Sequence, residues 1–445
     1  MSGGARLVVE PTDALADEPL SVRIEGLAPG ERVTLRAETE SLFCVNGDPR
    51  RSYGLPRWAA QAAFAAGPCG DVDLDRDAPL EGDWHAACGS APLYALRPCD
   101  APDRRVRRRA PRALADVPLP HDCTVRLVAT REDGATLEAA CTRRMLAPGT
   151  AVRDTAGEGF VARFFSPAAE GPRPAVVVLS GSEGRIEKAQ AIAGLFAAHG
   201  FRALALCYFG LEGAARHLDR IPLETVERAC RWLQDRPDVD ARRIGAFGRS
   251  KGGEMALAAA SLVPAITCVV ANAPSPVCYE GLRGSLPTRR SSWTWRGREL
   301  PCAKIPLSAL ARAPFARAAR PGRFTAWLYD VTLARADLER VRFPIERING
   351  PVLLTTSDDD EVWPARLHGE LAMEALDAAG FPHAREHRCL EGGCHTMTIP
   401  FQPAPALPAG VDVDAWARAT EAAWRATLAF LSEEGQGAAR RPARA

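Results

Sequence analysis

A serine between glycines stands where an apolar run meets a run of small residues, in the stretch IGAFGRSKGGEMALAAA, residues 244–260. Its centre, GRSKG, fits the pattern G-x-S-x-G, in which a sharp strand-to-helix turn exposes a nucleophilic hydroxyl. Such a turn needs small neighbours, and the surrounding glycines supply them. The N-terminus of the following helix also favours developing negative charge. We therefore predict that Ser250 is a nucleophile rather than an ordinary loop residue.

A serine hydroxyl reacts at neutral pH only when a base accepts its proton and a carboxylate orients that base. In this architecture the acid follows the serine along the chain, and the histidine comes last. The stretch PVLLTTSDDDEVWP offers Asp358, Asp359 and Asp360 directly after an apolar run. We favour Asp360, because D-E-V-W-P has the Asp-x-x-x-Pro form of acid loops in such enzymes, and keep Asp359 as the alternative acid. A solvated acidic loop is the competing interpretation of any single aspartate.

The predicted base is His395, one of eight histidines in the chain. It lies in EGGCHTMTIP, a glycine-rich loop after the last predicted strand, and it follows the candidate acids at a suitable distance along the chain. His383 and His387 lie within or beside the predicted strand HAREHRCL. We expect these two histidines to be structural or exposed.

Acyl chemistry also needs backbone N–H groups directed at the oxyanion of a tetrahedral intermediate. We predict that Lys251, the residue after the nucleophile, supplies one, and that Ser182 in the loop LSGSEGR supplies the other. That loop lacks the Gly-Lys-Ser/Thr ending of a phosphate-binding loop and the spacing of a dinucleotide fingerprint. No cluster has zinc-ligand spacing, and DLDRDAP at 73–79 lacks the glycine and the distal glutamate of a calcium loop. We predict no metal and no cofactor.

The elements that must position these residues alternate between apolar strands and amphipathic helices from about residue 159 onward. This alternation predicts a mostly parallel sheet with helices on both faces. The long segment 276–345 interrupts it, and we interpret that segment as a cap over the carboxyl ends of the strands. Its aromatic residues could form a wall of an acyl pocket or the core of the cap: Trp293, Trp295, Trp327 and Tyr329.

In the first third of the chain, apolar residues recur with a different period. Stretches such as LSVRIEGL and RVTLRAET alternate apolar and polar residues at close spacing, which predicts a β-sandwich over residues 1–146. The sequence LAPGT suits a linker, so a catalytic domain is expected over residues 150–434. Residues 435–445 are expected to form a disordered tail.

Composition excludes several classes of protein. The 445 residues are 47% hydrophobic and 25% charged, with a net charge of +1, so bulk electrostatics favours neither nucleic acid nor an anionic membrane as a partner. The basic run at 104–112 is interpreted as a solvated loop. We find neither a signal peptide nor a membrane span. Thirteen cysteines without CxxC pairs indicate free thiols, and hence a cytoplasmic protein.

The chain resembles the acyl-CoA thioesterase / bile acid-CoA:amino acid N-acyltransferase (BAAT) family. The motifs that carry the resemblance occur in the family's order from about residue 10 to 432: DEPLSVRIEGLAPGERVTLRAE, GDVDL, PLYALRP, ALALCYFG, IPLETVERACRWL, GRSKGGEMAL, NAPSPV, PIERINGPVLL, DDDEVWP and GGCHTMTIP. The resemblance implies an α/β-hydrolase domain behind an immunoglobulin-like β-sandwich. It also implies a catalytic triad of Ser250, Asp360 and His395.

In this family the thioesterases carry serine as the nucleophile and the bile-acid N-acyltransferases carry cysteine, so Ser250 favours hydrolysis. Two departures stand out: Cys394 replaces the glycine that usually precedes the base, and the C-terminal Ala-Arg-Ala is not a Ser-Lys-Leu peroxisomal signal.

The predicted activity is hydrolysis of an acyl thioester, carried by coenzyme A or an acyl carrier, through an acyl-enzyme. The alternatives are transfer of the acyl group to an amine or alcohol, an esterase or peptidase of the same fold, and a catalytically silent binding protein. The acyl chain, the carrier and the oligomeric state are left open.

Overall fold

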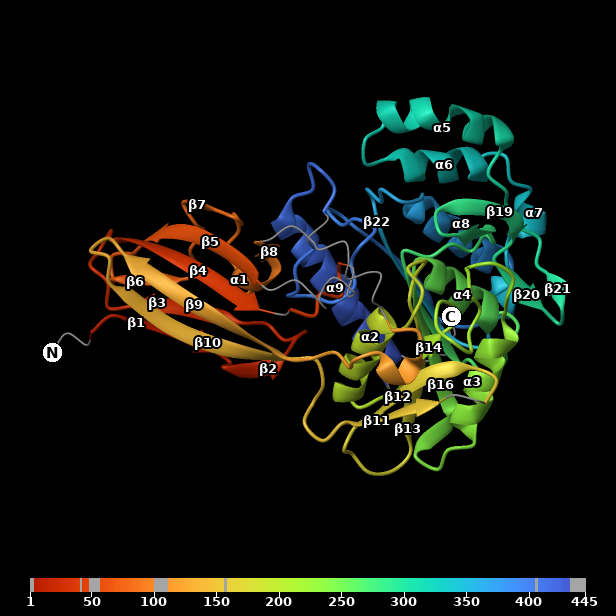
Figure 1. Cartoon of the computed structure of the whole chain (residues 1–445), viewed down its shortest axis with the longest axis horizontal. Helices are drawn as coiled ribbons and strands as arrows, with labels where there is room; N and C mark the ends of the chain where they lie inside the picture. Colours follow the sequence, from red (N-terminus) through yellow and green to blue (C-terminus); the bar gives the residue numbers. More distant parts are fainter. Residues whose placement is uncertain are drawn as a thin grey trace, which may run out of the picture. The chain divides into compact units, whose positions relative to one another are not determined.

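The computed structural model describes residues 4–40, 42–47, 57–99, 111–155, 158–404 and 407–432. The chain divides into two compact units, of which the first comprises Met1–Ala110, Leu119–Ala147 and Thr398–Glu421. The second comprises Pro111–Pro118, Pro148–Met397 and Ala422–Ala445. Figure 1 shows the elements of both. The predicted tail 435–445 and nearly all of the basic run lie outside the described residues.

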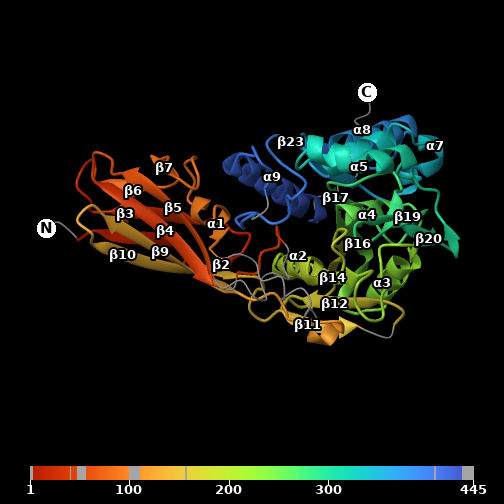
Figure 2. The same ribbon diagram turned by 45° about the horizontal axis from the view of Figure 1, so that its top comes forward.

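The first unit is built from two sheets (Figures 1 and 2). The smaller sheet has the strand order β1-β3-β6, and the larger has the order β2-β10-β9-β4-β5-β7, with β8 paired to β5. The strands are β1 (Arg6–Glu10), β2 (Asp13–Leu15), β3 (Ser21–Glu25), β4 (Arg32–Glu40), β5 (Arg57–Ala65), β6 (Asp71–Asp73), β7 (Glu81–Gly82), β8 (Arg97–Pro98), β9 (Cys123–Arg131) and β10 (Thr136–Arg144), with the short helix α1 (Ala91–Tyr94). Alternate residues of β3, β4 and β9 are buried, among them Ile24, Leu35 and Leu127. The predicted β-sandwich is confirmed.

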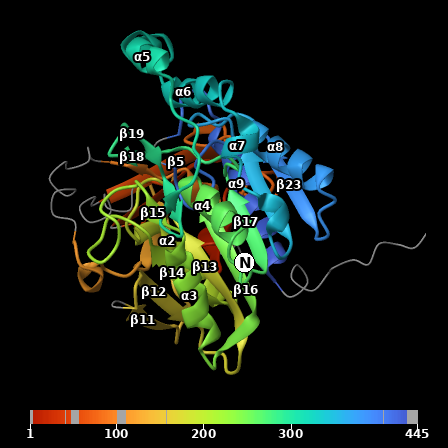
Figure 3. The same ribbon diagram turned by 90° about the vertical axis from the view of Figure 1, so that its right-hand side faces the viewer.

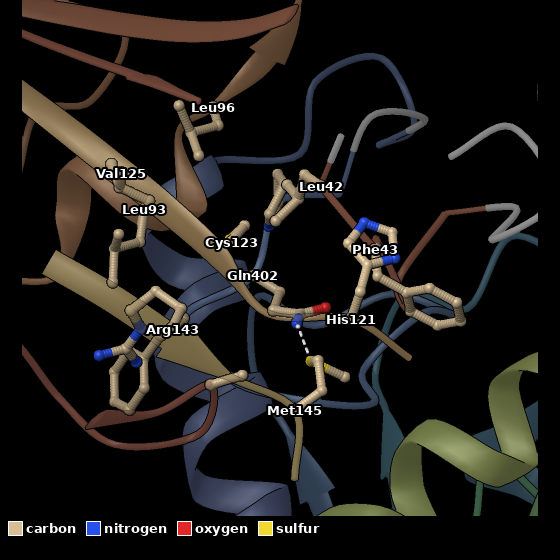
Figure 4. A pocket seen from close by; sticks show the side chains of 13 residues that line it. Leu42, Phe43, Leu93, Leu96, His121, Cys123, Val125, Arg143, Met145 and Gln402 are labelled. Atoms are coloured by element: carbon tan, nitrogen blue, oxygen red, sulfur yellow. Dashed lines mark hydrogen bonds between the residues drawn. The ribbon is translucent and has the colours of Figure 1, made fainter. Parts of the chain in front are cut away.

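The segment that follows the candidate base contributes to the interior of this first unit. Asn46 donates side-chain hydrogen bonds to the carbonyl oxygens of Ile399 and Gln402, at 2.9 and 3.2 Å. Gln402 in turn donates to the sulfur of Met145, beside a small pocket with mainly apolar walls (Figure 4). The pocket volume of about 20 Å³ admits about one water molecule. This pocket is therefore too small for an acyl chain.

The second unit contains an eight-stranded sheet in the order β11-β12-β14-β13-β16-β17-β22-β23. Its strands are β11 (Ala151–Thr155), β12 (Val161–Ser166), β13 (Arg173–Leu179), β14 (Arg202–Cys207), β16 (Val239–Arg249), β17 (Cys268–Asn272), β22 (Val352–Ser357) and β23 (Arg385–Leu390). The pairs β11–β12 and β12–β14 are antiparallel, and the pairs from β14 to β23 are parallel. The mostly parallel sheet is confirmed.

Helices cover both faces of this sheet because its central strands are apolar on both sides. The helices are α2 (Glu187–Ala198), α3 (Glu224–Gln234), α4 (Lys251–Ala260), α8 (Ala365–Ala378) and α9 (Val413–Leu431). Val177 of β13 shares a core cluster with residues of α3, α4 and α8. On the opposite face, Phe247 of β16 packs edge-on against Phe196 of α2, which stacks on Trp424 of α9. Together with the strand-to-helix turn at Ser250, this is the α/β-hydrolase fold.

The predicted insert forms small sheets and three helices between β17 and β22. It contains β18 (Glu280–Arg283), β19 (Leu286–Ser291), β20 (Trp293–Trp295), β21 (Arg298–Glu299), α5 (Leu307–Ala319), α6 (Phe324–Leu333) and α7 (Leu338–Val341), and β20 also pairs with β15 (Ile221–Pro222). Helices α5 and α6 lie side by side (Figures 1 and 3). Trp293 and Tyr329 are buried in core clusters, whereas Trp295 and Trp327 are partly exposed. No helix among the described residues is long and apolar enough to cross a membrane.

Candidate active site

The turn between β16 and α4 holds Ser250 in a strained backbone conformation, with φ 55° and ψ −123°. A residue other than glycine rarely occupies this region, and such strain persists where the surrounding structure enforces it. Packing around the turn explains the glycines. A Cβ on Gly252 would lie 2.2 Å from the carbonyl oxygen of Ser180, and a Cβ on Gly248 would lie 2.1 Å from that of Gly252. The turn therefore requires glycine at both Gly248 and Gly252, two residues before and two residues after the serine.

His395 connects the serine to a carboxylate. Its Nε2 lies 2.8 Å from the Oγ of Ser250, and its Nδ1 lies 2.7 Å from the Oδ2 of Asp360. The other oxygen of Asp360 accepts backbone hydrogen bonds from Val362 and Trp363, at 2.8 and 3.1 Å. All three side chains are buried, so hydrogen bonds rather than water fix the carboxylate and the imidazole. The structure brings these three predicted residues together.

The alternative acid lies elsewhere. Asp359 is exposed and forms an ion pair with Arg323, which precedes α6. Asp358 is also exposed, and the carboxylate that contacts His395 is that of Asp360. Only one of the three consecutive acidic side chains is therefore in place to orient the imidazole.

The loop that carries His395 is held by the acid loop. The backbone N–H of His395 donates to the carboxylate of Glu361 at 2.9 Å, and the ring packs edge-on against Trp363 with 5.9 Å between centroids. Cys394, the departure noted in the sequence, is buried beside it, and burial raises the pKa of this thiol to about 12. The thiol therefore stays protonated at neutral pH.

The predicted oxyanion donors come from two elements. Lys251 is the first residue of α4, where N–H groups have no acceptor within the helix. Ser182 is exposed in the loop after β13. Its neighbour Gly181 lies close to the nucleophile, since a Cβ on Gly181 would lie 3.3 Å from the Cβ of Ser250. The N–H of Gly181 itself donates to Glu183 at 3.2 Å, so Gly181 is not a free donor.

The sequence analysis did not predict the buried polar network that is centred on the first turn of α4. Glu254 accepts hydrogen bonds from the Nζ of Lys251 at 3.0 Å, the backbone N–H of Tyr279 at 3.1 Å and the indole of Trp293 at 2.8 Å. Burial raises the pKa of Glu254, and the nearby ammonium of Lys251 opposes this effect. The network ties the first turn of α4 to the insert. The i, i+3 spacing of the two charged residues is a signal that would have indicated the pair.

The other histidines near the site have structural partners. His368 is fully buried, and its Nε2 lies 2.8 Å from the hydroxyl of Tyr279. Burial lowers the pKa of His368 to about 3, although the charge of Asp360 partly opposes the shift. His387 was predicted to be structural or exposed, and its Nε2 lies 2.8 Å from the hydroxyl of Thr356. Among the described residues, no group of three or more acidic, histidine or cysteine side chains is placed to hold a metal ion.

The comparisons place the chain among known proteins. The N-terminal region of the acyl-CoA thioester hydrolase/BAAT family matches residues 17–155, and the C-terminal region of the same family matches residues 221–289 and 325–436. The structure of the carboxylesterase EstE1, cloned from a metagenomic library, has 19% sequence identity and a TM-score of 0.39, covering 64% of this chain and 90% of its own.

Curated relatives match over nearly the whole length of the chain. Acyl-coenzyme A amino acid N-acyltransferase 2 of Mus musculus is 26% identical over 96% of this chain and 97% of its own. The peroxisomal succinyl-coenzyme A thioesterase of the same species is 27% identical over 96% of each chain. Acyl-coenzyme A thioesterase 1, also from Mus musculus, is 28% identical over 90% of this chain and 87% of its own. The chain belongs to the acyl-CoA thioester hydrolase/BAAT family.

Proposed function

We propose that the protein is a serine-dependent acyl thioester hydrolase with Ser250 as nucleophile, His395 as general base and acid, and Asp360 as the carboxylate that orients the histidine. The observation that carries the proposal is the pair of hydrogen-bond distances from the two nitrogens of His395. The strained turn at the serine supports it as well.

The reaction proceeds in two steps. His395 takes the proton from Ser250 as the hydroxyl oxygen attacks the thioester carbonyl, and the N–H groups of Lys251 and Ser182 stabilise the oxyanion. Collapse of this intermediate breaks the carbon–sulfur bond, and the thiol leaves with the proton held by the histidine. Water, deprotonated by His395, then attacks the acyl-enzyme and releases the acid. Asp360 keeps the imidazole oriented and stabilises its charged form in both steps.

Transfer of the acyl group to an amine is the second candidate, because curated relatives include both thioesterases and amino acid N-acyltransferases. The two reactions share the acyl-enzyme and differ only in the acceptor. Serine at position 250 favours water, since cysteine is the nucleophile of the bile-acid N-acyltransferases that the chain resembles. An esterase or peptidase of the same fold would differ in the leaving group.

A panel of acyl-CoA, oxyester and peptide substrates tests the proposal. We expect the wild-type protein to release free acid from thioesters and Ser250→Ala to release none. We also expect a fluorophosphonate to label Ser250. Reactions with added amino acids separate the two candidates, because an amide product formed faster than free acid would establish the acyltransferase instead. Absence of thioester cleavage together with cleavage of oxyesters would assign the esterase.

We further propose the division along the chain predicted from the sequence, with residues 1–146 as an N-terminal domain and 150–434 as the catalytic domain, although Thr398–Glu421 lies in the first compact unit. A reducing compartment, the cytoplasm, is proposed because all thirteen cysteines are free thiols. Redox-sensitive labelling of the thiols in cells would test this location.

A further inference from the structure

Lys251, the residue directly after the nucleophile, has a buried ammonium that is enclosed by protein groups. The residue is 2% exposed. Its Nζ donates to the Oε1 of Glu254 at 3.0 Å and to the hydroxyl of Ser292 at 2.9 Å, and the second oxygen of Glu254 lies 2.8 Å from the same nitrogen. The ring centroids of Tyr279 and Trp293 lie 5.7 and 5.8 Å from the Nζ. A carboxylate, a hydroxyl and two aromatic rings therefore replace water around this charge.

The carboxylate of this pair connects the helix to the insert. Glu254 is fully buried, and its Oε1 also accepts hydrogen bonds from the backbone N–H of Tyr279 and the indole of Trp293. Ser292 adds to the connection, because its hydroxyl donates to the carbonyl oxygen of Tyr279 at 2.9 Å. Lys251 and Glu254 both belong to the first turn of α4. Their side chains therefore attach this turn at several points to the segment between β17 and β22.

Stability alone does not account for a buried pair of opposite charges at this position. Removing two charges from water is costly, and well-packed apolar side chains of similar volume often stabilise a protein as well or better. A buried polar network whose members are hydrogen-bonded does, however, favour one arrangement of its groups. The pair therefore suits a place where the position of the backbone matters more than stability.

The backbone beside the pair carries one of the predicted oxyanion donors. The N–H of Ser250 donates to the carbonyl oxygen of Asn272 at 2.8 Å, which fixes the chain just before Lys251. The N–H of Lys251 has no acceptor within its own helix, and the preceding residue has the strained φ of 55°. A donor stabilises an oxyanion only at about 2.7–3.1 Å from it. The side chain of Lys251 is thus a second attachment for the peptide unit that must meet this condition.

We propose that the buried pair of Lys251 and Glu254 positions the backbone N–H of Lys251 for the oxyanion by anchoring the first turn of α4 to the insert. The two side chains are positioning groups, since their hydrogen bonds are to the protein and they act through the N–H. This inference rests on the proposed function, because it concerns the transition state at Ser250.

Two variants separate positioning from stability. Lys251→Met leaves the carboxylate of Glu254 without its counter-charge, so we expect a lower urea midpoint as well as a lower kcat. In the buried double variant, Lys251→Met with Glu254→Gln, neither charge is left alone and an amide oxygen still accepts from Tyr279 and Trp293, so the midpoint should recover. Its kcat for butyryl-CoA should stay about tenfold or more below the wild-type value, with KM changed by less than about threefold, because the oxyanion forms only in the transition state.

The matched control is Arg366→Met with Glu370→Gln, which removes an exposed pair on α8 and should leave kcat within about twofold of the wild-type value. All variants are assayed at a temperature at which circular dichroism shows them folded, so kcat decides the question whether or not the midpoint recovers. A wild-type kcat in the buried double variant would overturn the inference, because the pair would then act through stability alone. A raised KM with unchanged kcat would also overturn it.

Labelling of Ser250 by a fluorophosphonate gives a readout that needs no thioester. Attack on phosphorus also places negative charge on an oxygen, so labelling of the buried double variant should be about tenfold or more slower than that of the wild-type protein. If the wild-type protein is labelled but cleaves no thioester, the proposed function fails and the labelling rate decides the inference, which equal rates would overturn. A wild-type protein that is neither labelled nor active would overturn both.

Discussion

At the residue scale, the structure distinguishes between adjacent side chains of the same type. Asp360 is buried and its carboxylate contacts His395, whereas Asp359 is exposed and pairs with Arg323. Sequence reasoning favoured the right member of this pair for contact with the histidine on the form of the loop. It could not exclude the neighbour, because consecutive residues of a loop project in different directions that only the folded chain defines.

Substitution of the two aspartates tests this distinction. Asp360→Asn should lower kcat by about 10⁴-fold, because an amide no longer holds the histidine in the correct tautomer. Asp359→Asn should change kcat by less than about threefold, since an exposed ion pair contributes little. Steady-state kinetics with one acyl-CoA substrate measure both. The reverse order of effects would assign the catalytic acid to Asp359.

At the scale of elements, the turn between β16 and α4 depends on close approach of backbones. A Cβ on Gly252 would lie 2.2 and 2.4 Å from the carbonyl oxygens of Ser180 and Leu179. Gly252→Ala should therefore lower the free energy of unfolding by about 1–3 kcal/mol and slow labelling of Ser250 by a fluorophosphonate. Chemical denaturation and labelling kinetics measure the two effects.

Gly4→Ala serves as the control for this change, because a Cβ on Gly4 would meet no atom within 4 Å. The same added methyl group should then leave stability and labelling near their wild-type values. Wild-type labelling in Gly252→Ala would show that the turn tolerates a side chain there.

The buried pair of Lys251 and Glu254 in the first turn of α4 supports a second prediction at this scale. Glu254→Ala leaves the buried ammonium of Lys251 without its carboxylate, which should cost about 3–5 kcal/mol of unfolding free energy. Glu370→Ala removes the carboxylate of an exposed pair with Arg366 and should cost less than about 1 kcal/mol. Urea denaturation compares them, and equal losses would show that the buried pair adds no stability.

At the scale of the whole molecule, His368 links stability to pH. In the folded protein burial lowers its pKa to about 3, and its ordinary value is 6.5. The unfolded chain therefore binds a proton at this site between these two pH values while the folded protein does not. Stability conferred by the neutral imidazole is fully present above pH 6.5. It is lost as the pH falls below 6.5, by up to about 1.4 kcal/mol per pH unit.

Denaturation experiments between pH 7 and pH 5 measure how steeply the free energy of unfolding depends on pH. His368→Gln should have a lower stability at pH 7 and a shallower dependence on pH, because its side chain does not titrate. His85→Gln is the control, since His85 is exposed and should leave the slope unchanged. An unaltered slope in His368→Gln would show that another group carries the pH dependence.

The sequence by itself determined the features that depend on neighbouring residues. The two-residue period of the first third predicted the sandwich, the alternation of apolar runs and helical stripes predicted the parallel sheet, and G-x-S-x-G predicted the turn at Ser250. These signals are local, because periodicity and steric limits at a turn act between residues close together in the chain.

Only the tertiary structure decided which distant side chains meet. It joined His395 to Ser250 across the sheet and to one aspartate of three, and it placed Thr398–Glu421 within the first unit. It also buried Arg249 beside the nucleophile and Glu254 in the first turn of α4. These side-chain contacts depend on how elements far apart in the sequence pack together. Local sequence patterns do not specify that packing.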